Sequence, residues 1–145
     1  MGARRIGREV AVQALYRMAA TGESEVGAVF WEHFAPDDGD ARDFAAHLVR
    51  GVRAEGARID ALIGESADNW RVERIALVER CVLSVAVYEL LVERHTPVSV
   101  VIDEAVEIAR RFGQEESAAF VNGVLDRIAR RVRPAPEEGE PGVRR

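Results

Sequence analysis

The chain has little of what disulfide scaffolds, metal sites or membrane spans require. Cys81 is the single cysteine among 145 residues, which excludes an internal disulfide and a cysteine-rich metal site. No apolar run has the length of a signal peptide or a bilayer span, so we expect a cytoplasmic protein. Lysine is absent, and all 20 basic residues are arginine. Because a genome-wide habit explains this usage as well as a local adaptation does, it supports no functional inference.

Recognisable catalytic motifs are missing as well. The sequence has no glycine-rich phosphate loop, no His-Glu-x-x-His and no Gly-x-Ser-x-Gly. His33, His47 and His95 are far apart and none stands in a metal-ligand pattern. Carboxylate pairs such as Asp103-Glu104 are explained by the helix dipole or by solvation. Nothing in the sequence therefore points to an enzyme, a metal or an organic cofactor.

What the sequence does contain is helical periodicity. A hydrophobic share of 48% and a charged share of 31% are typical of a globular chain, and the long periodic stretches favour an all-α fold. Residues 77–92, LVERCVLSVAVYELLV, are apolar on nearly every side. Such a helix must be enclosed by other helices, so we expect it at the centre of the fold. Cys81 lies within it and is expected to be an inert buried thiol.

Other stretches predict about seven helices in total. They are expected at residues 4–20, about 25–34, about 41–63, a short turn or helix at 69–75, and then 97–112 and about 115–132 around the central helix. Val10, Ala11, Ala14, Leu15 and Met18 form the packed face of the first. Thr96 is the expected N-cap and Pro97 the first residue of the sixth. Residues 133–145 are rich in proline and glycine and are expected to be a disordered tail.

Charge is distributed unevenly along the chain. The net charge is −5, yet residues 1–18 carry Arg4, Arg5, Arg8 and Arg17 against a single acid, whereas residues 21–43 carry seven acids against one arginine. A local basic patch matters more for nucleic-acid binding than the total charge. Tyr16 lies on the same helix and offers a ring on which an RNA base could stack. Taken alone, the arginines are better explained as a solvated helix face, because short basic helices are common.

Two further signals stay open at the level of single residues. Phe112-Gly113 is followed by Asn122-Gly123 inside the next helix, which indicates a close approach of two helices or a side-chain contact to the backbone, and ordinary packing explains it as well. Glu79 and Glu89 stand on the otherwise apolar central helix. Each is either a contact for a partner protein or a side chain that reaches solvent.

Three stretches together resemble one family. RRIGREVAVQALY (residues 4–16), VERCVLSVAVYELL (78–91), and VIDEAVEIARRFG (101–113) with FVNGVLDRI (120–128) are similar, in this order, to the bacterial transcription antitermination factor NusB. The resemblance implies two small helical bundles, at about 4–64 and 69–132 within a domain at 1–132, without catalytic activity or cofactor. It further implies binding of boxA RNA together with the small-subunit ribosomal protein NusE, and indirect contact with RNA polymerase.

The resemblance also assigns roles to particular positions. As RNA-binding residues it implies Arg4, Arg5, Arg8, Tyr16, Phe112 and Glu116. As residues that bind the partner protein it implies Tyr16, Glu73 and Glu79. The sequence departs from the family pattern at Ser84, where arginine is frequent, and at Asp103, where asparagine is commoner.

Two other interpretations remain. A similar helical module precedes the catalytic domain of some ribosomal RNA cytosine methyltransferases, although those chains are much longer. Alternatively, the chain is a pure protein-interaction module, for example a homodimer that covers its RNA-binding face.

Overall fold

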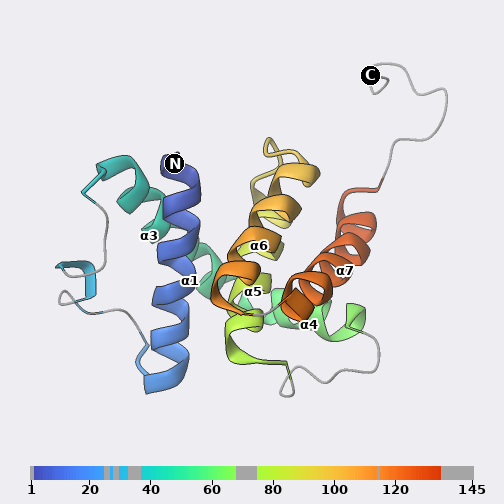
Figure 1. The fold of residues 1–145 in the computed structure, drawn as a ribbon, viewed down its shortest axis with the longest axis horizontal. Helices are drawn as coiled ribbons and strands as arrows, with labels where there is room; N and C mark the ends of the chain where they lie inside the picture. The colour runs from blue at the N-terminus through green and yellow to red at the C-terminus, as the bar shows by residue number, and fades with distance from the viewer. Residues whose placement is uncertain are drawn as a thin grey trace.

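The computed structural model describes residues 2–24, 27, 30–32, 37–67, 75–113 and 115–134. These residues contain helices and no strand, which confirms the predicted all-α fold. The helices, shown in Figure 1, are α1 (Ala3–Thr21), α3 (Gly39–Ala54), α4 (Gly56–Ser66), α5 (Leu77–Val92), α6 (Val98–Phe112) and α7 (Glu115–Val132). No helix within the described ranges is long and apolar enough to cross a membrane.

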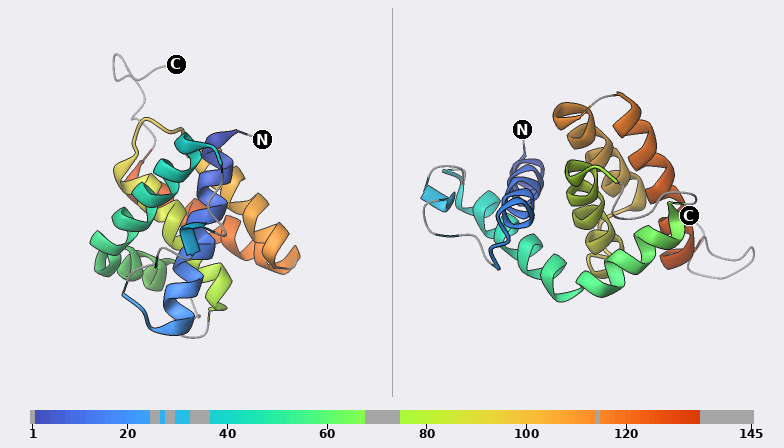
Figure 2. Two further views of the ribbon diagram at one scale, coloured as in Figure 1. Left: turned by 90° about the vertical axis from the view of Figure 1, so that its left-hand side faces the viewer. Right: turned by 90° about the horizontal axis from the view of Figure 1, so that it is seen from below.

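Helix α5 is the centre of the fold, as its all-round apolar sequence predicts. Every residue from Cys81 to Leu91 is buried, which no helix with one solvent-facing side could achieve. It packs against α1, α3, α4, α6 and α7. Figure 2 shows α1 and α3 on one side of α5 and α6 and α7 on the other. Burial of each large side chain, such as Leu83 or Leu90, contributes roughly 1.5–3 kcal/mol.

Helix α1 packs on α3 and α5 through the face that its periodicity predicts. Val10, Ala11, Ala14, Leu15 and Met18 are all buried. The helix begins one residue before the predicted start and ends one residue after the predicted end. On another side of α1, Tyr16 is exposed, whereas Val12, one turn before it, is buried.

The single helix predicted over residues 41–63 is wrong, because two helices meet at Glu55. Helix α3 begins earlier, after Asp38, whose carboxylate accepts hydrogen bonds from the backbone N–H of Asp40 and Ala41 at 2.8 and 3.3 Å. Helix α4 then leaves at an angle and packs against α5 and α7. The predicted division into bundles at residues 64–69 stays a prediction, and this packing favours a boundary at Glu55 instead.

The predicted start of the sixth helix is also wrong by one residue. Pro97 is the N-cap of α6 and its carbonyl accepts from the N–H of Val101, whereas the Thr96 side chain caps nothing. The Thr96 carbonyl instead accepts from Arg133, whose guanidinium also donates to the carbonyls of Glu89, Leu90 and Glu93. Arg133 thereby satisfies the last carbonyls of α5. It belongs to the folded part of the chain and not to the predicted tail.

Some predictions lie outside the described residues. Of the helix expected at 25–34, residues 27 and 30–32 are described; residues 30–32 are helical and Gly27 is not. The short turn or helix expected at 69–75 lies outside except for Ile75, and so does Glu73. Of the predicted tail, residues 135–145 are outside.

Candidate nucleic-acid interface

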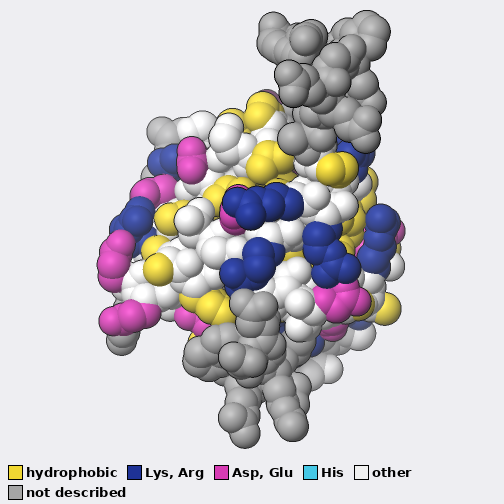
Figure 3. All heavy atoms as spheres, turned by 90° about the vertical axis from the view of Figure 1, so that its right-hand side faces the viewer, with side chains coloured by type: hydrophobic (Ala, Val, Ile, Leu, Met, Phe, Trp, Pro, Cys, Tyr) yellow, Lys and Arg dark blue, Asp and Glu magenta, His cyan; other side chains and the backbone are white. Residues whose placement is uncertain are grey.

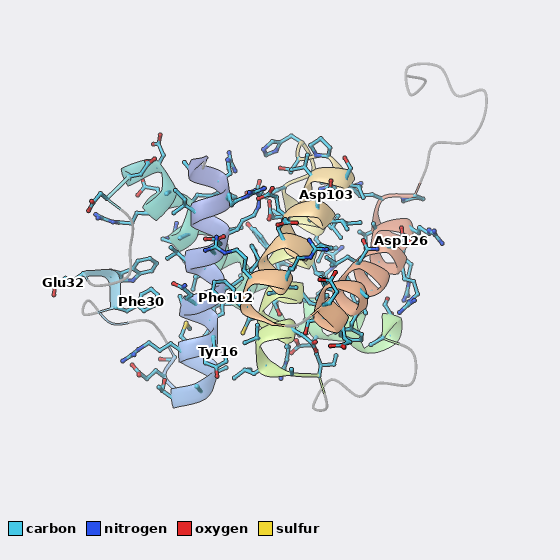
Figure 4. All side chains as sticks on the ribbon, viewed as in Figure 1. Tyr16, Phe30, Glu32, Asp103, Phe112 and Asp126 are labelled. Atoms are coloured by element: carbon cyan, nitrogen blue, oxygen red, sulfur yellow. The ribbon has the colours of Figure 1, made fainter. Side chains whose placement is uncertain are left out.

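Three of the candidate RNA-binding residues, Arg5, Tyr16 and Phe112, lie along one line between α1 and α6. Residues four, seven and eleven positions after Arg5 share its side of α1, and residues 104, 108 and 111 share one side of α6. Two ion pairs, Arg5–Glu104 and Glu9–Arg111, join these two stripes, and Figure 4 shows α1 and α6 next to each other. We call this strip the α1–α6 seam and define it by six residues: Arg5, Glu9, Tyr16, Glu104, Arg111 and Phe112.

Arg5 occupies the N-terminal end of the seam, and its neighbour Arg4 lies outside the seam, against Phe44 of α3. Arg4 is exposed, and its guanidinium lies 4.2 Å from the centroid of the Phe44 ring, a cation–π contact. This contact depends on Gly7, where a Cβ would lie 2.9 Å from Cδ2 of Phe44. The glycine that weakens α1 locally therefore lets the N-terminus of α1 lie close to α3.

Arg5 forms a two-pronged ion pair with Glu104 of α6. Its Nε and Nη2 donate to the two carboxylate oxygens at 2.8 and 2.6 Å. The hydrogen bond to Arg5 is the largest influence on the pKa of Glu104 and lowers it, and the same bond raises the pKa of Arg5. Arg5 stays 40% exposed, whereas Glu104 is 16% exposed. The cation faces solvent and the carboxylate lies beneath it.

Arg8 does not have the exposed position that a phosphate ligand requires, so this part of the predicted RNA site is corrected. The residue is 5% exposed. Its Nε and Nη2 both donate to Glu89 of α5 at 2.8 Å. Glu89 is 1% exposed, so it neither reaches solvent nor faces a partner protein, as either sequence interpretation required. The pair joins α1 to α5 inside the core.

Glu9 and Arg111 form a second ion pair across the seam, between α1 and α6. Here the polarity is reversed, because α1 supplies the acid and α6 the arginine. The Arg111 guanidinium also lies 5.9 Å from the centroid of the Phe112 ring. Glu9 is 14% exposed and Arg111 50%, so the cation is again the outer partner.

Tyr16 and Phe112 meet at the other end of the seam. Both line a shallow pocket of about 260 Å³ together with Val12, Gln13 and Val78. They are 43% and 39% exposed, which is unusual for large apolar rings. Figure 4 shows them on facing sides of α1 and α6. Tyr16 lies about 16 Å along α1 from Arg5, at roughly 1.5 Å per residue.

The predicted partner-binding residue Glu79 lies just beyond this pocket, next to Val78. It is half-buried, and its carboxylate accepts a hydrogen bond from Ser117 Oγ of α7 at 2.6 Å. Glu79 therefore has a structural role, because it joins α5 to α7, and its role in partner binding stays a prediction. Glu116 is exposed in the first turn of α7, and no contact within the described residues joins it to the seam.

Sequence reasoning missed Glu9, Glu104 and Arg111. The spacing of Glu104 and Arg111, seven residues apart, places both on one side of a helix and could have indicated a stripe. Their pairing with Arg5 and Glu9 could not be found, because it depends on α1 and α6 lying across from each other.

A second group of arginines lies on α7, on the face shown in Figure 3. Arg130 pairs with Asp126 and Arg131 with Glu65, both at 2.8 Å. Arg127 donates to the backbone carbonyl of Ser66 at 2.7 Å. Over the described ranges, no cluster of His, Cys, Asp or Glu could hold a metal ion.

The fold and this strip together define a class: an all-helical protein with an exposed line of arginine and aromatic side chains across two helices. Comparison with known proteins narrows the class. The model of the NusB family matches residues 5–130. The chain is 45% identical to the transcription antitermination protein NusB of Syntrophotalea carbinolica, over 92% of this chain and 96% of the relative. It is 46% identical to the protein of the same name from Myxococcus xanthus, over 89% and 96%.

Solved structures agree. NusB of T. maritima is 38% identical, with a TM-score of 0.80 over 95% of this chain and 96% of that one. A complex of the antitermination factors NusB and NusE with double-stranded RNA contains a chain that is 28% identical, with a TM-score of 0.81 over 90% and 98%. The chain belongs to the NusB family.

Proposed function

We propose that this chain is a transcription antitermination factor that binds boxA RNA of nascent ribosomal transcripts together with NusE, and so promotes read-through by RNA polymerase. Its role is binding and not catalysis, and it acts in the cytoplasm, where bacterial transcription takes place. Relatives that match nearly the whole chain carry this name. A similar chain has been solved with NusE and RNA.

The observation that carries the proposal is the chemistry of the α1–α6 seam. The partly exposed guanidinium group of Arg5 lies at one end, next to the exposed Arg4, and the exposed rings of Tyr16 and Phe112 lie at the other. Cations bind phosphates irrespective of sequence, and exposed rings stack on unpaired bases. A single strand that lies along α1 would meet both. Arg8 is no longer part of this set, because Glu89 holds it in the core.

The RNA test is fluorescence anisotropy with a boxA-type oligomer in the presence of NusE, over a salt series. Each phosphate contact on a single strand adds about 0.7 to the slope of log affinity against log salt. Replacing Arg4 and Arg5 by Ala should therefore flatten the slope by up to about 1.4 and weaken binding to every RNA alike. The matched control removes Arg130 and Arg131 on α7, which changes the net charge equally and should leave the slope nearly unchanged.

Tyr16 is tested in the same assay. Tyr16→Ala should weaken binding by about 1–3 kcal/mol with little change in slope, because a stacked ring contributes no phosphate contact. Tyr16→Phe keeps the ring and should bind like wild type. Circular dichroism must show that every variant is folded. If the Arg4/Arg5 variant kept the affinity and slope of wild type, the arginines would be a solvated face and the proposal would fail.

A further inference from the structure

We propose that Glu104 and Glu9 occupy the phosphate sites of the seam while RNA is absent, and that RNA phosphates replace these carboxylates on Arg5 and Arg111. The two acids would thus be internal competitors that set the affinity for RNA. This inference rests on the proposed function, because it concerns how the same seam receives the strand.

The first argument is the geometry of the Arg5 pair. Both Nε and Nη2 of Arg5 donate to Glu104, which is the two-pronged arrangement that guanidinium groups also use for phosphate. A phosphate that binds Arg5 through this edge must displace the carboxylate. Because Arg5 is the more exposed partner of the two, a ligand that arrives from solvent reaches the guanidinium without passing Glu104.

The second argument is that the Glu9–Arg111 pair repeats the pattern with opposite polarity. Again the arginine is the exposed partner and the carboxylate the covered one. The outer rim of the seam is therefore cationic and its floor anionic. A strand lying between the helices would meet Arg5 from α1 on one side and Arg111 from α6 on the other, next to the Phe112 ring.

The third argument concerns what happens to the displaced carboxylate. Nη1 of Arg8 lies 3.9 Å from Oε1 of Glu104, so Glu104 keeps a neighbouring cation when Arg5 turns to phosphate. Arg5 and Glu104 are also only partly buried, and ion pairs of this kind contribute little to stability. An RNA phosphate can therefore replace the Glu104 carboxylate on Arg5 at a small cost in free energy. The lowered pKa of Glu104 keeps the competitor charged at neutral pH.

An opposite role is conceivable on the same geometry. Glu104 could hold Arg5 by one edge while phosphate binds the other, in which case the acid positions the arginine and removing its charge weakens RNA binding. The two roles predict effects of opposite sign, so affinity decides between them.

The test compares Glu104→Gln with Asp103→Asn. Asp103 is the exposed neighbour of Glu104 on α6, and both substitutions raise the net charge by one. By anisotropy with a boxA-type single strand, Glu104→Gln should tighten binding roughly two- to fivefold, the range that a partly exposed ion pair allows. Asp103→Asn should change it less than about twofold, because it removes charge without freeing an arginine.

A double-mutant cycle then identifies the mechanism. If Glu104 competes for Arg5, the gain from Glu104→Gln should vanish in an Arg5→Ala background, since no guanidinium remains to be freed. Glu9→Gln should tighten binding in the same way and lose its gain in an Arg111→Ala background. Arg111→Ala alone should lower the salt slope by about 0.7. Thermal unfolding of each variant checks that the fold is kept.

Three results would overturn the inference. Weaker binding by Glu104→Gln would make the acid a positioning residue. An equal gain in the presence and absence of Arg5 would make it a long-range charge. A gain no larger than that of Asp103→Asn would leave it without special effect. Wild-type protein that failed to bind RNA at all would instead refute the proposed function.

Discussion

Among single residues, Arg8 and Glu89 show how burial changes the role of a charge. Transferring both groups into the core has a desolvation penalty that their mutual attraction only just offsets, so such a pair is weak evidence for stability. What it does provide is orientation. Both hydrogen bonds fix the position of α1 along its axis relative to α5. This position also determines where the seam begins.

The first prediction concerns this pair. Glu89→Ala should lower the free energy of unfolding by about 3–5 kcal/mol, because Arg8 is left buried without its partner. Replacing both residues together, Arg8→Met with Glu89→Leu, should restore most of that loss. Urea denaturation of Glu89→Ala, of the single variants Arg8→Met and Glu89→Leu, and of the double variant measures these effects. Losses that simply added up in the double variant would show that the two side chains do not act as a pair.

Residue-level prediction from sequence succeeds where one helix decides the outcome and fails where two helices must meet. The position of Cys81 in the middle of an apolar helix predicts its burial, which raises the pKa of the thiol to about 11 and leaves it protonated at neutral pH. The fates of Arg5 and Arg8 differ although both stand on the first helix. Arg5 stays at the surface because its partner Glu104 lies on α6, whereas Arg8 is buried because its partner Glu89 lies on the central helix α5.

At the scale of whole elements, the contact between α3 and α5 shows a similar limit. Gly51 lowers the helix propensity of α3, and from the sequence it is as plausible a break as Gly56. The structure shows α3 unbroken through Gly51, because the Tyr88 ring of α5 lies against it: a Cβ at this position would be 2.2 Å from Cζ of Tyr88. The break occurs at Glu55, where α4 turns toward α5 and α7.

This contact yields the second prediction of stability. Gly51→Ala should lower the free energy of unfolding by about 1–3 kcal/mol, since the added methyl group overpacks the contact with Tyr88. Gly56→Ala is the matched control. No atom lies within 4 Å of a Cβ there, so the same change should be neutral or stabilise by about 0.4–1 kcal/mol. Equal denaturation midpoints for the two variants would contradict the close approach of α3 and α5 at Gly51.

At the scale of the whole molecule, the two ends of the seam have different neighbours. The arginine end borders the N-terminal part of α3 through Phe44. The aromatic end borders the start of α5, where Val78 lines the Tyr16 pocket and Glu79 follows it. A partner protein bound at Glu79 would therefore lie beside the RNA bases that stack on Tyr16 and Phe112, and away from Arg4 and Arg5. This arrangement fits joint recognition of one strand by two proteins.

The last prediction tests the partner side of the proposal, and the structure changes the substitution that suits it. Charge reversal at Glu79 would remove the hydrogen bond from Ser117 and disturb the contact between α5 and α7. Glu79→Gln keeps an oxygen that can accept this bond and removes only the charge. If NusE presents a basic group there, Glu79→Gln should weaken the heterodimer roughly two- to fivefold, as expected for a partly exposed ion pair. Its thermal stability should stay at the wild-type value.

Calorimetric titration of NusE into each variant measures this effect. Asp126→Asn is the control, because it makes the same change in net charge on the outer side of α7 (Figure 4) and should leave the affinity unaltered. Titration at two salt concentrations adds a second criterion: the difference between wild type and Glu79→Gln should shrink at high salt, where exposed charges are screened. An unchanged affinity for Glu79→Gln at both concentrations would limit Glu79 to its bond with Ser117, and the partner surface would have to be sought around Tyr16 alone.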